Sequence, residues 1–588
     1  MTFETHPISF QPMGRKLRGR QGETIMAVAI RENVPLRSDC GSKGVCAKCT
    51  VIAEPAEHLS SLSEAELERL NGEQISANYR LACQVTILGP ITVTIPEQFI
   101  DRKYVKGKTG IKGRFPSDPL VERLLVDRAD RKESRAKSKD MVDEIRVNVT
   151  DASGNGLRLS SHHSLRALSM PEALQGDLTL VNHRDKGVTA VLAGKHPRGL
   201  GLAVDIGTTT LAAYLCDMQS GELLSSSASV NPQRRYGEDV ISRIDYANKG
   251  ADNLTTLRDL VVEGMSFLAL RCVEEVGASL SDIDEVAVVG NTTMEHLFTG
   301  THPGSLGMSP YLPINREPLQ LCADDIGFNV NPGTNIYVFP VISGFVGGDT
   351  MGAIIADGLH HRDDRSLIVD IGGIRAVPGA ISNVAVDPDN GGVTYQLIGE
   401  SDAIKPMGLC GSGIIDAVAT LRKAGIIVPS GRFDESAPGV LIDENGMANG
   451  FELVPAEKSG TGSSICVSLK DVRQIQLAKA ALAAGISYLL EYSKIDDLDR
   501  TVLTGAFGAK FDWRNAVAIG MLPNLVAKGT VLPKENLAGV GAIMALLDRK
   551  KRAETAQVYQ GIEFIELAGR PDFQTKLIEH INFPELDG

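Results

Sequence analysis

The spacing of hydrophobic positions changes along the chain and divides it into regions. Within residues 1–98, ITVTIP (91–96) alternates with the two-residue period of a half-buried strand, and QGETIMAVAIREN (21–33) intersperses apolar and polar residues as a helix does. This part predicts a small domain of short strands and turns around one helix. From 199 onward, glycine-rich strand–turn units alternate with apolar helices, which predicts an α/β architecture over residues 199–588.

The residues between these two regions differ from both in composition. DRKYVKGKTGIKGR (101–114) is basic and poor in apolar residues, and RADRKESRAKSKD (128–140) is a dense run of charges. We predict a basic linker over 99–140, with the second run a solvated helix or its flank, although a basic run could also dock an acidic partner. Residues 141–198 predict a small α/β middle domain. There DEIRVNVT (143–150) and TAVLAG (189–194) read as strands, and HSLRALSMPEALQG (163–176) as a helix pair broken near Pro171.

Length and charge narrow the class of protein. A chain of 588 residues predicts about four domains. Its formal net charge of −13 argues against a general nucleic-acid binder. No stretch reaches the roughly 18 uncharged apolar residues of a membrane span, and MTFETHPISF lacks the features of a secretory signal. We therefore expect a cytoplasmic protein with neither a nucleic-acid nor a membrane partner.

Four of the nine cysteines gather between positions 40 and 83. DCGSKGVCAKCT spaces Cys40, Cys46 and Cys49 as C-x5-C-x2-C, and Cys83 follows in RLACQV. A 2Fe–2S cluster needs four thiolates, three of which can come from one loop if glycines such as Gly41 and Gly44 let the backbone turn its N–H groups toward the sulfurs. The alternative is a zinc site, but zinc motifs usually show two paired halves and Cys83 has no neighbouring Cys or His.

The cysteine loop resembles vertebrate-type ferredoxins, whose first spacing is also x5, and so does the RLACQ setting of Cys83. The resemblance covers about residues 8–98 and implies a β-grasp domain that holds a 2Fe–2S cluster through Cys40, Cys46, Cys49 and Cys83 and transfers one electron at a time.

A second kind of chemistry begins at GLAVDIGTTTLAAYLCD (201–217), which reads strand, turn, strand. A glycine turn exposes N–H groups to phosphate oxygens, hydroxyls add donors, and an Asp at a strand end can hold hydrated Mg²⁺. The candidates are Asp205, Gly207, Thr208, Thr209 and Thr210. An ordinary hairpin is the alternative for this segment taken alone.

Further glycine turns follow in order. Asp349 starts a helix after two glycines, a good position for phosphate, and SLIVDIGG ends a second strand at Asp370. The remaining candidates in these turns are Gly372, Gly373, Gly411, Ser412, Gly413, Gly505 and Gly508. GVGAIMALLD (539–548) ends the series with a helix. Any one of these five segments could be an ordinary turn or helix, but the five in this order form a pattern.

This order resembles the ASKHA superfamily, the two-lobed fold of actin, Hsp70 and sugar kinases. The resemblance implies lobe I at about 199–360 plus 536–560 and lobe II at about 365–535. It makes Asp205–Thr210 and Asp370–Gly373 the two phosphate loops, 343–355 and 539–548 the connecting helices, and Gly505–Gly508 the adenosine-side loop. It also implies ATP with Mg²⁺ between the lobes, and Asp205, Asp349 and Asp370 as catalytic residues.

The combination of domains resembles the reductive activators of corrinoid proteins over essentially the whole chain, and NPQRRYGEDVISRIDYA (231–247) and GNTTMEHLF (290–298) match as well. The resemblance implies ATP-dependent one-electron reduction of cob(II)alamin to cob(I)alamin in a methyltransferase system. Its partners would be a corrinoid protein and an electron-donor protein or flavoprotein. The sequence does not decide between a monomer and a homodimer.

One stretch departs from that family. There, the second Asp-Ile-Gly turn is followed by Thr-Asn-Gly-Glu and further loop residues, whereas here Asp370-Ile371-Gly372 runs almost directly into 373–381. A block of the second phosphate loop is missing, so we expect weaker binding of Mg-nucleotide and less secure ATP hydrolysis.

Two other functions compete with the activator. The first is an iron–sulfur electron-transfer adaptor whose degenerate ASKHA domain only binds a partner. The second is an activator of another low-potential enzyme, like the dehydratase activators; those usually hold a 4Fe–4S cluster between subunits, which the cysteine spacing here argues against.

Overall fold

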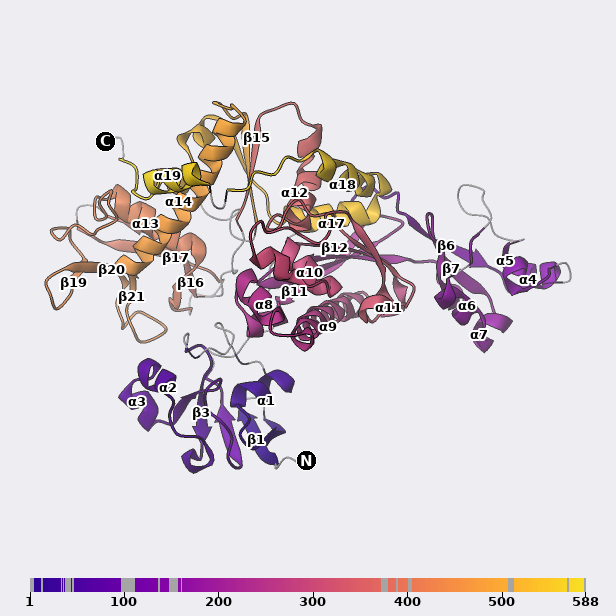
Figure 1. Cartoon of the computed structure of the whole chain (residues 1–588), viewed down its shortest axis with the longest axis horizontal. Coiled ribbons are helices and arrows are strands. Elements are labelled where there is room, and N and C mark those ends of the chain that lie inside the picture. Colours follow the sequence, from indigo (N-terminus) through magenta and orange to yellow (C-terminus); the bar gives the residue numbers. More distant parts are fainter. Residues whose placement is uncertain are drawn as a thin grey trace. The chain divides into compact units, whose positions relative to one another are not determined.

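The computed structural model describes the chain apart from residues 1–4, 12–13, 33, 35, 37–43, 45–46, 97–110, 136–137, 147–156, 160, 372–378, 388–389, 400–403, 506–511, 568–569 and 586–588. Two compact units are present, one of residues 1–355 with 538–561 and one of residues 356–537 with 562–588 (Figure 1). None of the described helices is both long and apolar enough to cross a membrane.

The N-terminal region is a five-stranded sheet in the order β2-β1-β5-β3-β4, with β1 and β5 parallel. Its core contains Ile8, Phe10, Val28, Val51 and Val93, so strand and helix turn their apolar positions inward as predicted. The elements are β1 (Thr5–Gln11), β2 (Arg15–Arg20), α1 (Ile25–Arg31), β3 (Thr50–Glu54), α2 (Glu64–Arg69), α3 (Gly72–Ser76), β4 (Tyr79–Leu81) and β5 (Ile91–Thr94).

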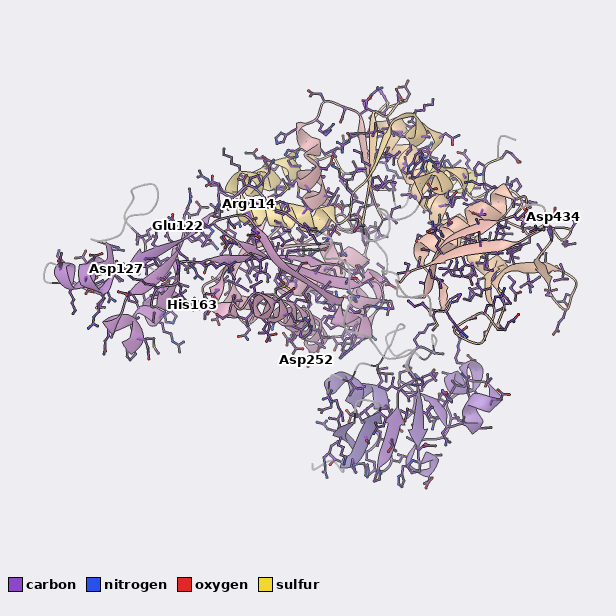
Figure 2. All side chains as sticks on the ribbon, turned by 180° about the vertical axis from the view of Figure 1, so that it is seen from behind. Arg114, Glu122, Asp127, His163, Asp252 and Asp434 are labelled. Carbon is purple, nitrogen blue, oxygen red and sulfur yellow. The ribbon has the colours of Figure 1, made fainter. Side chains whose placement is uncertain are left out.

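A three-stranded antiparallel sheet, β6-β7-β8, forms the middle region. Figure 2 labels Glu122 on β6, whose carboxylate accepts a hydrogen bond of 3.0 Å from Asn182 on β7. The elements are β6 (Val121–Val126), α4 (Arg128–Arg135), α5 (Met141–Arg146), α6 (His162–Leu168), α7 (Pro171–Gln175), β7 (Leu178–His183) and β8 (Gly187–Ala193).

Two expectations for this region need correction. DEIRVNVT was predicted as a strand, but its described part lies in helix α5, because Met141, Val142 and Ile145 share one face and buried Glu144 pairs with Arg131 of α4. The range predicted as linker, 99–140, contains β6, which pairs with β7 along its full length. The helix pair broken at Pro171 is confirmed as α6 and α7.

The rest of the first unit is built on a six-stranded sheet in the order β11-β10-β9-β12-β14-β13. Its core lies between this sheet and helices that include α9 and α10. The strands are β9 (Leu200–Ile206), β10 (Thr210–Asp217), β11 (Leu223–Val230), β12 (Ile283–Gly290), β13 (Leu319–Cys322) and β14 (Asn335–Val338). The helices are α8 (Val240–Ala247), α9 (Ala251–Glu275), α10 (Thr292–Thr299), α11 (Ala323–Ile326), α12 (Gly348–Asp357), α17 (Leu537–Leu547) and α18 (Arg549–Gly561).

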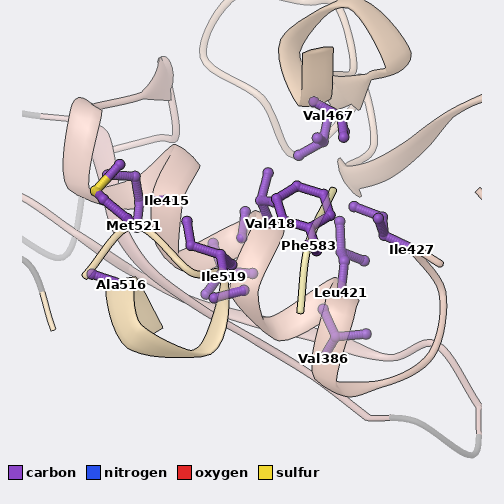
Figure 3. Packing of buried hydrophobic residues seen from close by; sticks show 14 of the residues in the cluster. Val386, Ile415, Val418, Leu421, Ile427, Val467, Ala516, Ile519, Met521 and Phe583 are labelled. Atoms are coloured by element: carbon purple, nitrogen blue, oxygen red, sulfur yellow. The ribbon is translucent and has the colours of Figure 1, made fainter. Parts of the chain in front are cut away.

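The second unit contains the parallel sheet β15-β22-β23 and two further three-stranded sheets, β17-β16-β18 and β19-β20-β21. Figure 3 shows part of its core, where Val418 and Leu421 of α13 pack with Val386 of β16 and with Phe583. The strands are β15 (Ser366–Asp370), β16 (Ala380–Val386), β17 (Val393–Leu397), β18 (Gly408–Leu409), β19 (Val440–Ile442), β20 (Ala448–Val454), β21 (Ile465–Ser468), β22 (Arg500–Thr504) and β23 (Thr530–Pro533). The helices are α13 (Gly411–Lys423), α14 (Leu469–Tyr492), α16 (Trp513–Ala518) and α19 (Pro571–Glu579).

Candidate functional site

Two of the four predicted cluster ligands lie side by side. Cys49 directly precedes β3 and Cys83 closely follows β4, and the pairing of Thr50 with Leu81 brings these strand ends together. The two Sγ atoms are 3.4 Å apart and both residues are buried. A disulfide would need about 2.05 Å, whereas two thiolates on a tetrahedral metal with bonds of about 2.3 Å lie about 3.8 Å apart. The pair therefore fits a shared metal; Cys40 and Cys46 lie outside the described residues.

The surroundings of Cys83 favour the thiolate. A hydrogen bond from Cys49 lowers the pKa of Cys83 against the effect of burial, and hydrogen bonds from the Gln84 side chain and the Gly44 backbone lower it further. Gly44 has φ +77°, and a Cβ there would lie 3.0 Å from Gln84, so the position requires glycine. The role predicted for Gly44 is confirmed, while Gly41 lies outside the described residues.

A buried ion pair supports the strand that leads to Cys83. Arg80 donates from Nε to Glu66 at 2.8 Å, and the N–H of Leu81 donates to the same carboxylate at 3.0 Å. Glu66 is fully buried, and its pKa is lowered because the bonds from Arg80, Ser63 and Leu81 outweigh burial, which alone would raise it.

The first predicted phosphate turn joins β9 to β10. Asp205 is buried near the end of β9, which lies between β10 and β12. The N–H of Gly207 donates to Thr210 O at 3.0 Å and closes the turn around Thr208 and Thr209.

Groups from three other segments hold this turn from behind. Asn231 donates from Nδ2 to Gly207 O at 2.9 Å and from its backbone N–H to Thr209 O at 2.8 Å. Arg243 donates to Thr208 O, and Asn291 donates from Nδ2 to Thr208 Oγ1 at 2.9 Å. In a trans peptide the N–H points opposite to the C=O, so carbonyls held from behind turn the N–H groups of Thr208 and Thr209 to the other side. Successive N–H groups that face one way form an anion-binding nest.

The helix start that carries Asp349 lies against the same support. A Cβ on Gly347 would lie 2.4 Å from Gly290 O and 2.5 Å from Asn291 Cα, so these backbones are in contact. Asn291 thus touches both the turn and the segment that leads into α12, and the structure brings Asp349 to the region of Thr208. Asp349 begins the helix as predicted.

A buried carboxyl lies behind this helix start. A Cβ on Gly348 would lie 2.3 Å from Glu295 Oε1, which shows how closely the side chain packs. Burial, and then the charge of Asp349, raise the pKa of Glu295 well above its usual value. The backbone N–H groups of Gly348 and Gly290 oppose this shift, but burial outweighs them and favours the neutral form of Glu295.

The second turn, in the other unit, brings together Asp370 and Gly505. Asp370 ends β15 opposite Thr504 of β22, and a Cβ on Gly505 (φ +91°) would lie 2.4 Å from both Asp370 Oδ1 and Ile371 O. Asp370 is exposed and lines an open, largely apolar groove with residues of α14. Gly372, Gly373 and Gly508 lie outside the described residues.

The turn at 411–413 forms the first turn of α13. A Cβ on Gly413 would lie 2.0 Å from Ile381 O, so this glycine lets the helix start pack on β16. Cys410 caps the helix, accepting from Gly413 N at 3.4 Å. Packing explains Gly413, and the nucleotide role of Gly411, Ser412 and Gly413 stays a prediction.

Comparisons with known proteins cover these regions in order. The profile of the 2Fe–2S iron–sulfur cluster binding domain matches residues 8–88, that of the RACo middle region matches 200–362, and that of the C-terminal ASKHA domain of RACo matches 370–588. The corrinoid activation enzyme RamQ of Eubacterium limosum is 28% identical over 94% of this chain and 95% of its own length. A solved reductive activator for a corrinoid iron–sulfur protein is 26% identical, with a TM-score of 0.65 over 99% of both chains. The chain belongs to the reductive activators of corrinoid proteins.

These matches bear on two alternatives. The N-terminal region matches the 2Fe–2S cluster binding domain, which favours a 2Fe–2S cluster over zinc at the cysteine site. The C-terminal region has the ASKHA fold, and the adaptor function is not favoured.

The sequence alone predicted no role for the residues that hold the first turn. Asn231 and Arg243 lie in the string 231–247, and Asn291 and Glu295 lie in 290–298, two strings that resemble the activator family. A run of polar residues next to apolar helix positions was the available signal, but only the folded chain shows which turn they contact.

Proposed function

We propose that this protein is an ATP-dependent reductive activator of a corrinoid protein in a methyltransferase system. It delivers one electron to cobalt and converts cob(II)alamin into cob(I)alamin. The observation that supports this most is that one chain joins the buried Cys49–Cys83 pair to a phosphate turn held from behind, in a family of activators. The partners are the corrinoid protein and an electron-donor protein or flavoprotein.

In this proposal Cys40, Cys46, Cys49 and Cys83 hold the cluster, which supplies one-electron chemistry when bound. Gly44 and Gln84 direct hydrogen bonds at Cys83, and Arg80 with Glu66 fixes the strand before it. Such bonds to a ligand sulfur stabilise negative charge and so tune the potential.

We assign the nucleotide site to the turns already described. Asp205 holds hydrated Mg²⁺, and Gly207, Thr208, Thr209 and Thr210 bind phosphate. Asp349 acts beside this turn as a base or water-orienting group. In the second unit we assign the shortened phosphate loop to Asp370 with Gly372 and Gly373, and a nucleotide-binding role to Gly411, Ser412, Gly413, Gly505 and Gly508. Nucleotide use makes an unfavourable electron transfer possible, since about 60 mV corresponds to a tenfold change in a one-electron equilibrium.

The domain limits that we propose are 1–98 for the ferredoxin domain and 199–588 for the ASKHA domain. The middle domain of 141–198 extends to include β6, because this strand belongs to the middle sheet.

The test is a reduction assay with the full chain. Chemically reduced protein is mixed with a cob(II)alamin-loaded corrinoid protein, with and without Mg-ATP, and the absorbance of cob(I)alamin is followed. We expect cob(I)alamin only with ATP, no cob(I)alamin with Cys83→Ser, and parental behaviour with Cys466→Ser, a cysteine outside the quartet. No reduction under either condition would overturn the proposal, and equal reduction without ATP would favour the adaptor.

A further inference from the structure

Arg243 is a buried cation directly behind the phosphate turn. It lies on α8 with a relative exposure of 0%. Its guanidinium donates to Thr208 O in the turn, from Nε to Gly237 O at 2.9 Å and from Nη1 to Gln233 Oε1 at 3.2 Å. Nη1 also lies 3.1 Å from Met294 Sδ.

These four partners are all neutral. Five other arginines with largely buried side chains each pair with a carboxylate: Arg80 with Glu66, Arg123 with Asp284, Arg131 with Glu144, Arg500 with Asp357 and Arg552 with Glu285. The acidic residues nearest along the chain are otherwise engaged. Glu238 is held by Arg234 at 2.8 Å, and Asp239 caps α8 by accepting from Ser242 N at 2.7 Å.

The charges of Glu238 and Asp239 act on Arg243 from a distance, but no carboxylate of the described residues contacts its guanidinium, and a buried charge without such a contact is costly for a fold to keep. Burial lowers the pKa of Arg243 to about 9, which leaves it protonated at neutral pH. A ligand that brings negative charge to the other side of the turn would stabilise this buried cation. The N–H groups of Thr208 and Thr209 face that side, so a phosphate bound there would be attracted by Arg243 through a thin, poorly polarisable layer of protein.

We infer that Arg243 supplies the positive charge against which the first turn binds the phosphate groups of a nucleotide. The inference rests on the proposed nucleotide site and identifies Arg243 as a positioning residue that acts through Thr208. It predicts that the loss of nucleotide affinity on removing the charge of Arg243 grows with the negative charge of the nucleotide. The ligand class is therefore a nucleoside polyphosphate rather than a nucleoside.

The experiment measures equilibrium binding of Mg-ATP, Mg-ADP, AMP and adenosine by calorimetry to the full chain and its variants. We expect Arg243→Gln to weaken Mg-ATP binding on the order of tenfold to hundredfold, Mg-ADP and AMP progressively less, and adenosine not at all. Arg243→Lys keeps the charge but loses the fork of donors, so it should recover part of the affinity. Equal losses with Lys and Gln, or an equal loss for adenosine, would overturn the inference and leave a structural role.

A second variant tests the charge without removing the arginine. Gln233→Glu places a carboxylate where Arg243 already donates, and should neutralise the cation and weaken Mg-ATP binding severalfold or more. Gln233 Nε2 also donates to Leu257 O at 2.9 Å, so Gln233→Met, which loses that bond without adding a charge, is the control. An equal loss with Gln233→Met would mean that Arg243 and Gln233 only hold the turn in shape. Gln233→Glu keeps the test open if Arg243→Gln does not fold, which the cluster spectrum and the melting temperature would reveal.

Arg131→Gln is the matched control, because it removes a buried arginine of the middle domain that is already paired with Glu144. It should lower stability and leave Mg-ATP affinity unchanged. Failure of the parent chain to bind Mg-ATP would count against the proposed nucleotide site itself. Binding by the parent that Arg243→Gln and Gln233→Glu leave unchanged would overturn the inference alone.

Discussion

The chain contains the same three residues, Asp-Ile-Gly, at the ends of two strands in two units. The first Asp-Ile-Gly, at 205–207, ends a strand that is paired on both sides, by β10 and by β12, and Asp205 is buried. The second, at 370–372, begins at the last residue of β15, whose described partner is β22, and Asp370 is exposed.

The difference lies in what stands behind each turn. Asn231, Arg243 and Asn291 hold the carbonyls and a hydroxyl of the first turn, and so fix which way its N–H groups face. At the second, the described support is the close approach of Gly505 to Asp370 and Ile371. A motif binds phosphate well only if its donors are oriented before the ligand arrives. We therefore expect the first turn to carry most of the phosphate affinity.

The largest expected effect comes from replacing the aspartate of each turn by alanine, in two separate variants. Asp205→Ala should abolish the effect of nucleotide on cobalamin reduction, with Mg-ATP binding weakened about a hundredfold or more, because a position that orients the metal's ligands is lost. Asp370→Ala should weaken Mg-ATP binding only a few-fold. Both variants should keep the visible spectrum of the cluster, which serves as the control for folding of the N-terminal domain. Parental binding by Asp205→Ala would show that the phosphate assignment is wrong, and equal losses would remove the contrast between the turns.

Features that a short segment determines by itself were predictable from the sequence. The cysteine spacing, the glycine at 44 and the strand–turn–strand at 201–217 follow from local backbone demands, and the structure confirms them for the described residues. The residues that make the first turn a site were not predictable in role. Asn231, Arg243 and Asn291 reach it from 24 to 83 positions away in the sequence, so only tertiary packing decides what they touch.

The incorrect strand prediction has the same origin. In DEIRVNVT, Ile145, Val147 and Val149 alternate as in a strand, but Met141 and Val142 just before it complete a helical face with Ile145. The buried pair of Glu144 with Arg131 favours the helix, and this pair joins α5 to α4. The sequence from residue 139 onward contains both the helical spacing of apolar residues and the two-residue alternation of a strand.

A smaller effect should follow from crowding the second turn. Gly505→Ala adds a Cβ that would lie 2.4 Å from Asp370 Oδ1 and Ile371 O, at a φ of +91°. We expect a loss of about 2–4 kcal/mol in the stability of the second unit, measured by denaturant unfolding, from left-handed strain and the clash together. Mg-ATP affinity should fall less than tenfold, because the first turn is unchanged.

The matched control for this change is Gly425→Ala. Gly425 has φ +74° in the same unit, but nothing lies within 4 Å of its Cβ position. Gly425→Ala introduces the left-handed strain without the clash, so we expect it to lower the stability of the second unit by about 1 kcal/mol. Equal losses in the two variants would mean that Gly505 does not constrain Asp370.

The smallest effect tests a neutral carboxyl behind the first turn. Burial and Asp349 raise the pKa of Glu295 above its usual value, so its proton stabilises the fold fully below pH 4.5, and this contribution is lost as the pH rises through the raised pKa. Glu295→Gln carries no such proton. Relative to the parent, its stability should therefore improve with rising pH, to about 1 kcal/mol near neutral pH.

Glu66→Gln is the opposite case, since the bonds from Arg80 lower the pKa of Glu66 and its contribution is present above pH 4.5. This variant should lose stability relative to the parent as the pH rises through that range. Hydrogen exchange, resolved by region between pH 3 and pH 8, covers both ranges and separates the two slopes, one on α10 and one on β4. Slopes of the same sign would mean that Glu295 is ionised in the fold, and that the first turn is held beside two negative charges rather than one.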